Sequence, residues 1–230
     1  MTNSARHIIA VLLVVIPFYL TAILQKTLLN PANIIAEEFL GYYMLLSLFG
    51  IAVILLLNKY LLKNSFNVFI IGKRKFIYDI TLALLLLGAI YFIQSLSGIS
   101  YGIWIEQDND RTAMMELLNI VFSSFINGII IIGPFTWSNE AFAVLSLAFI
   151  LNNLWAVSSN KTWTWFSIIF AALLFSLLQI NNGYSAIIDS FLLISFSNFI
   201  YFHYRSILPL FIAATLFQMI DLIAYWVYMM

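Results

Sequence analysis

Long runs of apolar residues, separated by short polar stretches, are the feature that most limits what this chain can fold into. A membrane-spanning helix needs about 20 mainly apolar residues. Eight runs meet or approach that length and are predicted to cross the membrane: 8–27, 39–57, 77–96, 113–132, 140–157, 163–180, 185–202 and 207–228.

The composition supports a membrane protein and excludes a water-soluble one. Of the 230 residues, 63% are hydrophobic and 9% are charged, whereas soluble domains contain about 25% charged residues. A chain of this length cannot bury so much apolar surface in a water-soluble fold. Runs such as LALLLLGAI lack the alternation of a membrane β-strand. We therefore predict an all-α polytopic membrane bundle of about eight transmembrane helices, with residues 1–230 forming one domain.

A cluster of positive charge predicts the orientation. The segment Asn58–Phe76 holds five of the ten Lys and Arg residues, and short positive loops stay in the cytoplasm. With eight spans, both termini are then cytoplasmic, and Arg6 brings the cytoplasmic count to six against four outside. We expect the protein to lie in the cell (inner) membrane of a bacterium.

Charge and residue usage exclude several functions. The net charge is zero, so no basic surface is available for nucleic acid. The chain has no Cys, which excludes disulfides, thiolate catalysis and Cys-ligated metals. His7 and His203 are the only histidines, too few for a His-rich metal site. We expect no cofactor and no metal.

Several polar residues fall at membrane depth within the predicted spans. Ionisable groups there are costly and are candidates for function. The other interpretation is hydrogen bonding between helices, which contributes about 0.6 kcal/mol on average. The residues concerned include Glu140, Asp189, Asp221, Gln179, Asn198 and Gln218.

Four segments carry a resemblance to a known family. In chain order they are FNVFIIGKRKF, IIIIGPFTWSNEAFAVLSL, FAALLFSLLQINNG and YRSILPLFIAATLFQ. Their order and spacing over about residues 66–221 resemble the CPBP family, which contains CAAX proteases and bacteriocin-processing (Abi) membrane proteins. The resemblance implies an intramembrane site for peptide hydrolysis, built from the motifs E-E-x-x-x-R, F-x-x-x-H and H-x-x-x-N.

The matching positions in this chain are mostly substituted. The glutamate pair becomes Asn139 and Glu140, and the arginine position becomes Val144. An alternative register anchored on Pro134 places Trp137 and Ser138 at the pair and leaves no acid.

The histidine and asparagine positions are substituted as well. The second motif keeps Phe175 but has Gln179 in place of histidine, and the third has Ala214 and Gln218. An amide is neither a general base nor a good zinc ligand. We therefore predict no confident catalytic residue, and we expect Glu140, Gln179 and Gln218 to converge in the interior of the bundle.

Three functions are compatible with these residues. The first is a non-proteolytic CPBP-like pseudoenzyme that acts as scaffold, accessory or regulatory subunit for a membrane-protein partner. The second is an active intramembrane endopeptidase with Glu140 as its base. The third is a channel or transporter subunit in which Glu140, Asp189 and Asp221 line an acidic path. The sequence names neither the partner nor a substrate.

Overall fold

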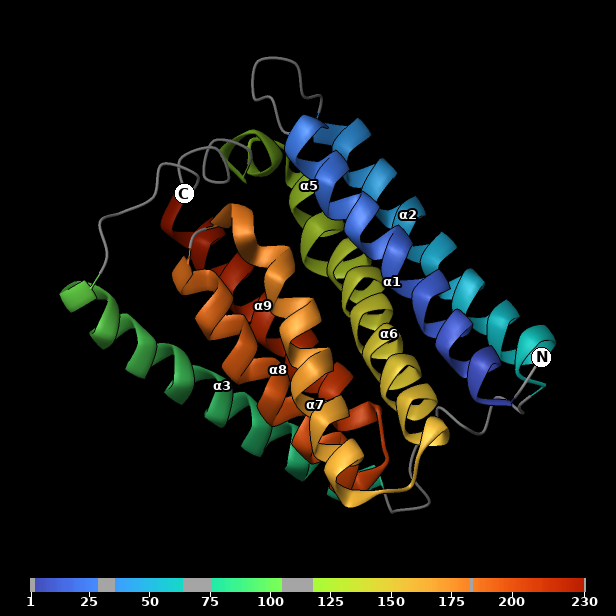
Figure 1. Cartoon of the computed structure of the whole chain (residues 1–230). Coiled ribbons are helices and arrows are strands. Elements are labelled where there is room, and N and C mark those ends of the chain that lie inside the picture. Colours follow the sequence, from blue (N-terminus) through green and yellow to red (C-terminus); the bar gives the residue numbers. More distant parts are fainter. Residues whose placement is uncertain (1–2, 29–35, 64–75, 105–117, 183, 230) are drawn as a thin grey trace.

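The computed structural model of the chain is a bundle of long helices (Figure 1). It describes residues 3–28, 36–63, 76–104, 118–182 and 184–229. Within these ranges every regular element is helical and no strand is present. The prediction of an all-α polytopic helical bundle is confirmed.

The helices follow the predicted spans closely in most of the chain. The tight connection of residues 158–160 joins α6 to α7, and residues 205–207 join α8 to α9, so each of these pairs is antiparallel. The elements in chain order are α1 (Asn3–Leu28), α2 (Ala36–Leu56) with its terminal turn η2 (Leu57–Leu61), α3 (Phe76–Trp104), α5 (Phe125–Ile130), η4 (Ile131–Phe135), α6 (Thr136–Val157), α7 (Lys161–Ser176), η5 (Leu177–Asn182), α8 (Tyr184–Tyr204) and α9 (Leu208–Met229).

Helix α6 is the centre of the bundle. It packs against α1 and α2 on one side and against α7 and α9 on the other, while α3 lies along α8 and α9 (Figure 1). Six consecutive residues of α6, Ser146–Leu151, are all buried. A helix that is buried around its whole circumference must be enclosed by other helices.

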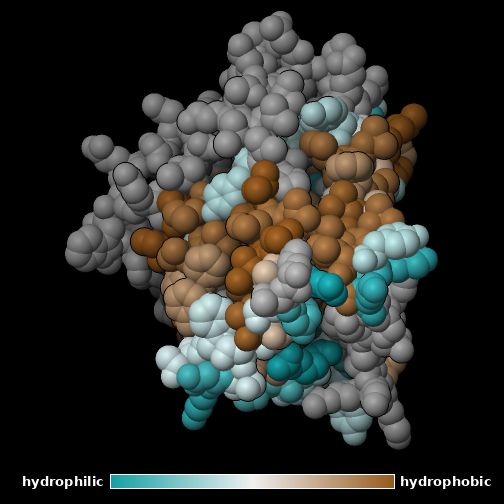
Figure 2. Space-filling model, turned by 45° about the vertical axis from the view of Figure 1, so that its right-hand side comes forward, coloured by the Kyte–Doolittle hydropathy of each residue, from teal (hydrophilic) through white to brown (hydrophobic). Residues whose placement is uncertain are grey.

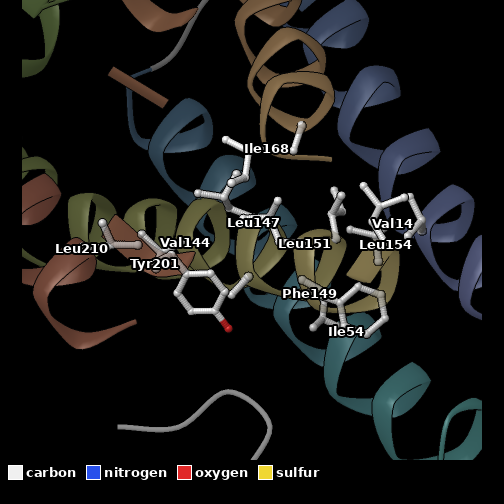
Figure 3. Close-up of a cluster of buried hydrophobic side chains, with 14 of the residues drawn as sticks. Val14, Ile54, Val144, Leu147, Phe149, Leu151, Leu154, Ile168, Tyr201 and Leu210 are labelled. Carbon is white, nitrogen blue, oxygen red and sulfur yellow. The ribbon is translucent and has the colours of Figure 1, made fainter. Parts of the chain in front are cut away.

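The apolar core gathers around α6, as Figure 3 shows. Seven buried residues of α6 belong to it, together with one or more from each of six surrounding helices. Burial of these side chains holds helices that are distant in sequence against one another. The labelled members are Val14, Ile54, Val144, Leu147, Phe149, Leu151, Leu154, Ile168, Tyr201 and Leu210.

The outer surface is apolar over much of its height. In Figure 2 hydrophobic side chains form a broad band, and hydrophilic ones gather toward the lower end of the same face. Leu45, Phe49 and Leu85 are each at least 65% exposed, as expected of helices whose outer faces contact lipid. Six helical segments are long and apolar enough to cross a membrane. The chain is therefore an integral membrane protein whose solvent is the lipid bilayer.

One predicted boundary is wrong. The runs 113–132 and 140–157 were expected to be separate spans, but α5, η4 and α6 form one candidate span, Phe125–Val157. The chain breaks earlier, at Ser124, which is extended (φ −111°, ψ 126°) and caps α5 by accepting a hydrogen bond from the Asn127 N–H. Residues 113–117 lie outside the described part of the chain.

The joined segment changes the number of long helical segments in the described part of the chain. In the described part, α1 and the six candidate spans make seven long helical segments. The start of α1 and the end of α9 accordingly lie at opposite ends of the bundle (Figure 1). The prediction that both termini are cytoplasmic depended on an even number of spans, and the seven long helical segments of the described part do not support that number.

Candidate functional site

The segment that contains Glu140 is shaped by a proline inside a helix. Pro134 has no N–H to donate to the preceding turn, and the helix widens there into the π-helical turn η4. The Thr136 hydroxyl donates to the Ile131 carbonyl (2.7 Å). The backbone thus passes through the proline without ending the span, since the polar groups around it find partners within the segment.

Two of the motif positions serve helix packing. Asn139 accepts a hydrogen bond from the Ser47 hydroxyl, which joins α6 to α2. Val144 is 8% exposed and belongs to the main apolar core. In this register the positions that resemble a glutamate and an arginine of the CPBP motif therefore hold helices together.

Glu140 lies one turn beyond η4 and is partly buried. Thr136 and Val144, one helical turn to either side, are both buried, so Glu140 lies on an inward-facing part of α6. Its carboxyl group makes no hydrogen bond or ion pair with the described residues. In the alternative register anchored on Pro134, Trp137 is exposed and Ser138 donates to the Phe135 carbonyl (2.9 Å).

The remaining motif positions do not form one interior site. Gln179 lies in η5 and is partly buried, as is Ala214 on α9. Gln218, however, is exposed, so the expectation that it lies in the bundle interior is wrong. The buried face of α9 carries Ala213 and Phe217 at a spacing of four residues. Gln218 follows Phe217 directly and is therefore rotated about 100° away from that face.

The three polar residues predicted at membrane depth lie in different environments. Asn198 is fully buried and its amide donates to the Ile168 carbonyl (2.9 Å), which joins α8 to α7. Asp189 is partly buried, and its Oδ1 atom has no hydrogen-bond partner among the described residues. Asp221 is exposed on α9 and accepts a hydrogen bond from the Tyr91 hydroxyl of α3 (3.3 Å).

The acidic residues are consequently dispersed over α6, α8 and α9. Within the described ranges, no group of three or more His, Cys, Asp or Glu side chains could hold a metal ion. The first segment of the family resemblance, FNVFIIGKRKF, falls almost entirely in residues 64–75, outside the described part of the chain.

A polar and aromatic cluster at the end where α8 meets α9 was not predicted. Trp155 stacks on Tyr201 (ring centroids 6.0 Å apart), and the Arg205 guanidinium lies 4.1 Å from the Trp155 ring. The Asn152 amide donates to the Tyr201 hydroxyl (2.7 Å). Aromatic and cationic side chains of this kind are typical of a membrane–water interface. The only sequence signal was the enrichment of Trp, Tyr and Arg near span ends.

Fold and surface together define a polytopic helical membrane protein. Comparisons with protein-family models, with curated proteins and with solved structures found no match. The resemblance to the CPBP family accordingly stays a hypothesis, carried by the four sequence segments alone.

Proposed function

We propose that the chain is a non-proteolytic, CPBP-like membrane protein that acts as a scaffold, accessory or regulatory subunit for another membrane protein. The observation that carries this proposal is the use of the motif positions for packing. Asn139 bonds to Ser47, Val144 lies in the apolar core, and Gln218 lies on the outside. A bundle stabilised in this way keeps its helical fold without a catalytic site, and its outer surface is available to bind a partner.

The chemistry of peptide hydrolysis favours the same conclusion. A general base must lie within hydrogen-bond reach of the water it activates, beside groups that stabilise the developing charge. Glu140 is inside the bundle, but the exposed Gln218 lies off the buried face of α9. Asn139, the other member of the expected pair, is already bonded to Ser47.

The proposed orientation follows from the seven helical segments. Arg6, Lys59, Lys63, Lys161 and Arg205 all lie near the end of the bundle where α1 begins. Lys73, Arg74 and Lys75 fall between α2 and α3 in the sequence, and that connection starts and finishes at the same end.

Counted by the connections in which they fall in the sequence, eight of the ten Lys and Arg residues are assigned to one end, and Lys26 and Arg111 to the other. This asymmetry is larger than the six to four that eight spans give. By the positive-inside rule, the N-terminus lies in the cytoplasm and the C-terminus outside. The membrane is the cytoplasmic membrane of a bacterium, as the family resemblance implies.

The proposed function is tested by purification from native membranes in a mild detergent. The expected result is a partner membrane protein in stoichiometric amount that is retained in Glu140→Gln. A chain that purifies alone contradicts the scaffold. Cleavage of a co-purified peptide that is lost in Glu140→Gln contradicts it as well and favours the endopeptidase.

A second candidate is a channel or transporter subunit, and the unpartnered acids favour it. The Glu140 carboxyl group has no hydrogen bond to the described residues, and Asp189 Oδ1 is buried without one. Intramembrane acids of this kind can line a path for cations or protons. Purified chain in liposomes with a proton or potassium gradient tests it. Flux that falls in both Glu140→Gln and Asp189→Asn supports the path, and no flux from the unmodified chain excludes it.

A further inference from the structure

An exposed strip of polar side chains runs along α9 within a candidate membrane span. Gln218, Asp221 and Tyr225 follow one another at spacings of three and four residues, which places them on one face of the helix. We call these three residues the α9 polar strip. Gln218 and Asp221 are both exposed. The strip therefore offers a carboxyl group and an amide to whatever surrounds the protein at that depth.

The depth of Asp221 follows from helix geometry. The apolar span runs from Leu208 to Val227, so Asp221 lies six residues from its end. At 1.5 Å per residue this is about 9 Å inside the span. A carboxyl group facing lipid at that depth is costly, and such groups normally face protein or water.

Neighbouring segments hold the strip in place. The Tyr91 hydroxyl of α3 donates to Asp221 (3.3 Å), and the Tyr91 ring packs against Phe217 (5.2 Å between centroids). The Tyr225 hydroxyl donates to Asn119, which precedes α5. The bond from Tyr91 is long and reaches only one oxygen of Asp221. The Asp221 carboxyl group can therefore accept a hydrogen bond from a further donor.

The charge of the α9 polar strip indicates which kind of partner it would bind. Asp221 carries the only carboxyl group of the α9 polar strip, and its hydrogen bond comes from the Tyr91 hydroxyl rather than from a basic side chain. A second copy of this chain that docked through the same strip would bring a second Asp221 carboxyl group to the contact. A cationic partner is favoured instead.

We propose that the α9 polar strip is the docking face for a transmembrane helix of a second membrane protein, and that this helix carries a Lys or Arg opposite Asp221. The inference rests on the proposed scaffold function and names the surface and the chemistry of its partner. The cationic side chain pairs with Asp221, and Gln218 supplies a hydrogen bond beside it. The exposed Ile220 and Ile223 flank the contact with apolar surface.

The test uses synthetic transmembrane peptides and the full-length chain in phosphatidylcholine vesicles. One poly-Leu peptide carries a single Lys six residues from an end, a second carries Glu there, and a third carries Leu. The chain has no Cys, so one Cys added at its C-terminus takes a fluorophore. Energy transfer between protein and peptide measures association. We expect the Lys peptide to bind about ten-fold more tightly than the other two.

Two variants then test whether the preference for the Lys peptide depends on the α9 polar strip. Asp221→Asn should abolish the Lys preference, and the matched control Asp189→Asn on α8 should keep it. Equal binding of the three peptides to the unmodified protein overturns the proposal, even where Asp221→Asn fails to fold. A Lys preference that emerges only in Arg111→Gln overturns it too, because Asp221 would then pair within its own chain. If the three peptides bind equally but a stoichiometric partner co-purifies in detergent, the scaffold function is retained. Only the assignment of the α9 polar strip as its docking face is then rejected.

Discussion

Substitution of Gly50 by alanine is expected to destabilise the protein, because the absent Cβ leaves space that the Phe142 ring of α6 fills. A Cβ added at Gly50 would lie within 2.8 Å of three carbons of that ring, closer than real Cβ contacts. The ring or the whole of α2 must shift to make room. The single methyl group added by Gly50→Ala therefore tests the contact between α2 and α6.

The magnitude follows from two opposing effects. Overpacking of a filled interior costs about 1–3 kcal/mol. Replacing glycine by alanine in the middle of a helix stabilises it by about 0.5–1 kcal/mol. We expect Gly50→Ala to lower the free energy of unfolding by about 0–2.5 kcal/mol. The measurement is an SDS titration in mixed micelles, followed by tryptophan fluorescence.

Gly41 provides the matched control in the same helix. A Cβ added at Gly41 meets nothing within 4 Å, so Gly41→Ala should keep the helix-propensity gain of about 0.5–1 kcal/mol. Combining Gly50→Ala with Phe142→Ala should cost less than the sum of the two single changes, because the ring that clashes is gone. Stabilisation by Gly50→Ala equal to that by Gly41→Ala would refute the packing of α2 on α6.

Two further predictions concern polar contacts between helices and use the same titration. Asn198→Ala should lower the free energy of unfolding by about 1 kcal/mol, because the buried bond to the Ile168 carbonyl is lost; an unchanged value would contradict the α7–α8 contact. Ser47→Ala should cost about 0.5–1 kcal/mol, and nothing more when combined with Asn139→Ala, since both changes remove the same bond. Additive costs would show that the two residues do not interact.

Most helices could be predicted from the sequence. The expected spans 163–180, 185–202 and 207–228 agree with α7, α8 and α9 to within a few residues. Apolar length alone fixes such helices, because backbone groups in lipid must bond within their own segment.

The continuity of α5 and α6 could not be predicted in this way. Gly133 and Pro134, followed by polar residues, form a pattern that normally marks a loop. In the structure the polar residues find partners inside the bundle, at Ile131 and on α2 at Ser47, so the helix continues. Such compensation depends on neighbouring helices, which local sequence does not specify.

The outward position of Gln218 could not be predicted from the sequence either. Helical periodicity indicates which residues share a face, but it identifies the buried face only where the other face is polar. Helix α9 is apolar around most of its circumference, with Ile220 and Ile223 exposed and Phe217 buried. The side on which α3 and α6 pack therefore decides where Gln218 points.

We propose that an odd number of membrane crossings places the positive end of the bundle in the cytoplasm and the last residues of α9 outside. The most direct measurement is a dual reporter of alkaline phosphatase and green fluorescent protein, fused after Lys75 and at the C-terminus. We expect fluorescence without phosphatase activity at Lys75, and phosphatase activity without fluorescence at the C-terminus. Fluorescence from both fusions would contradict it, because the chain would then cross the membrane an even number of times.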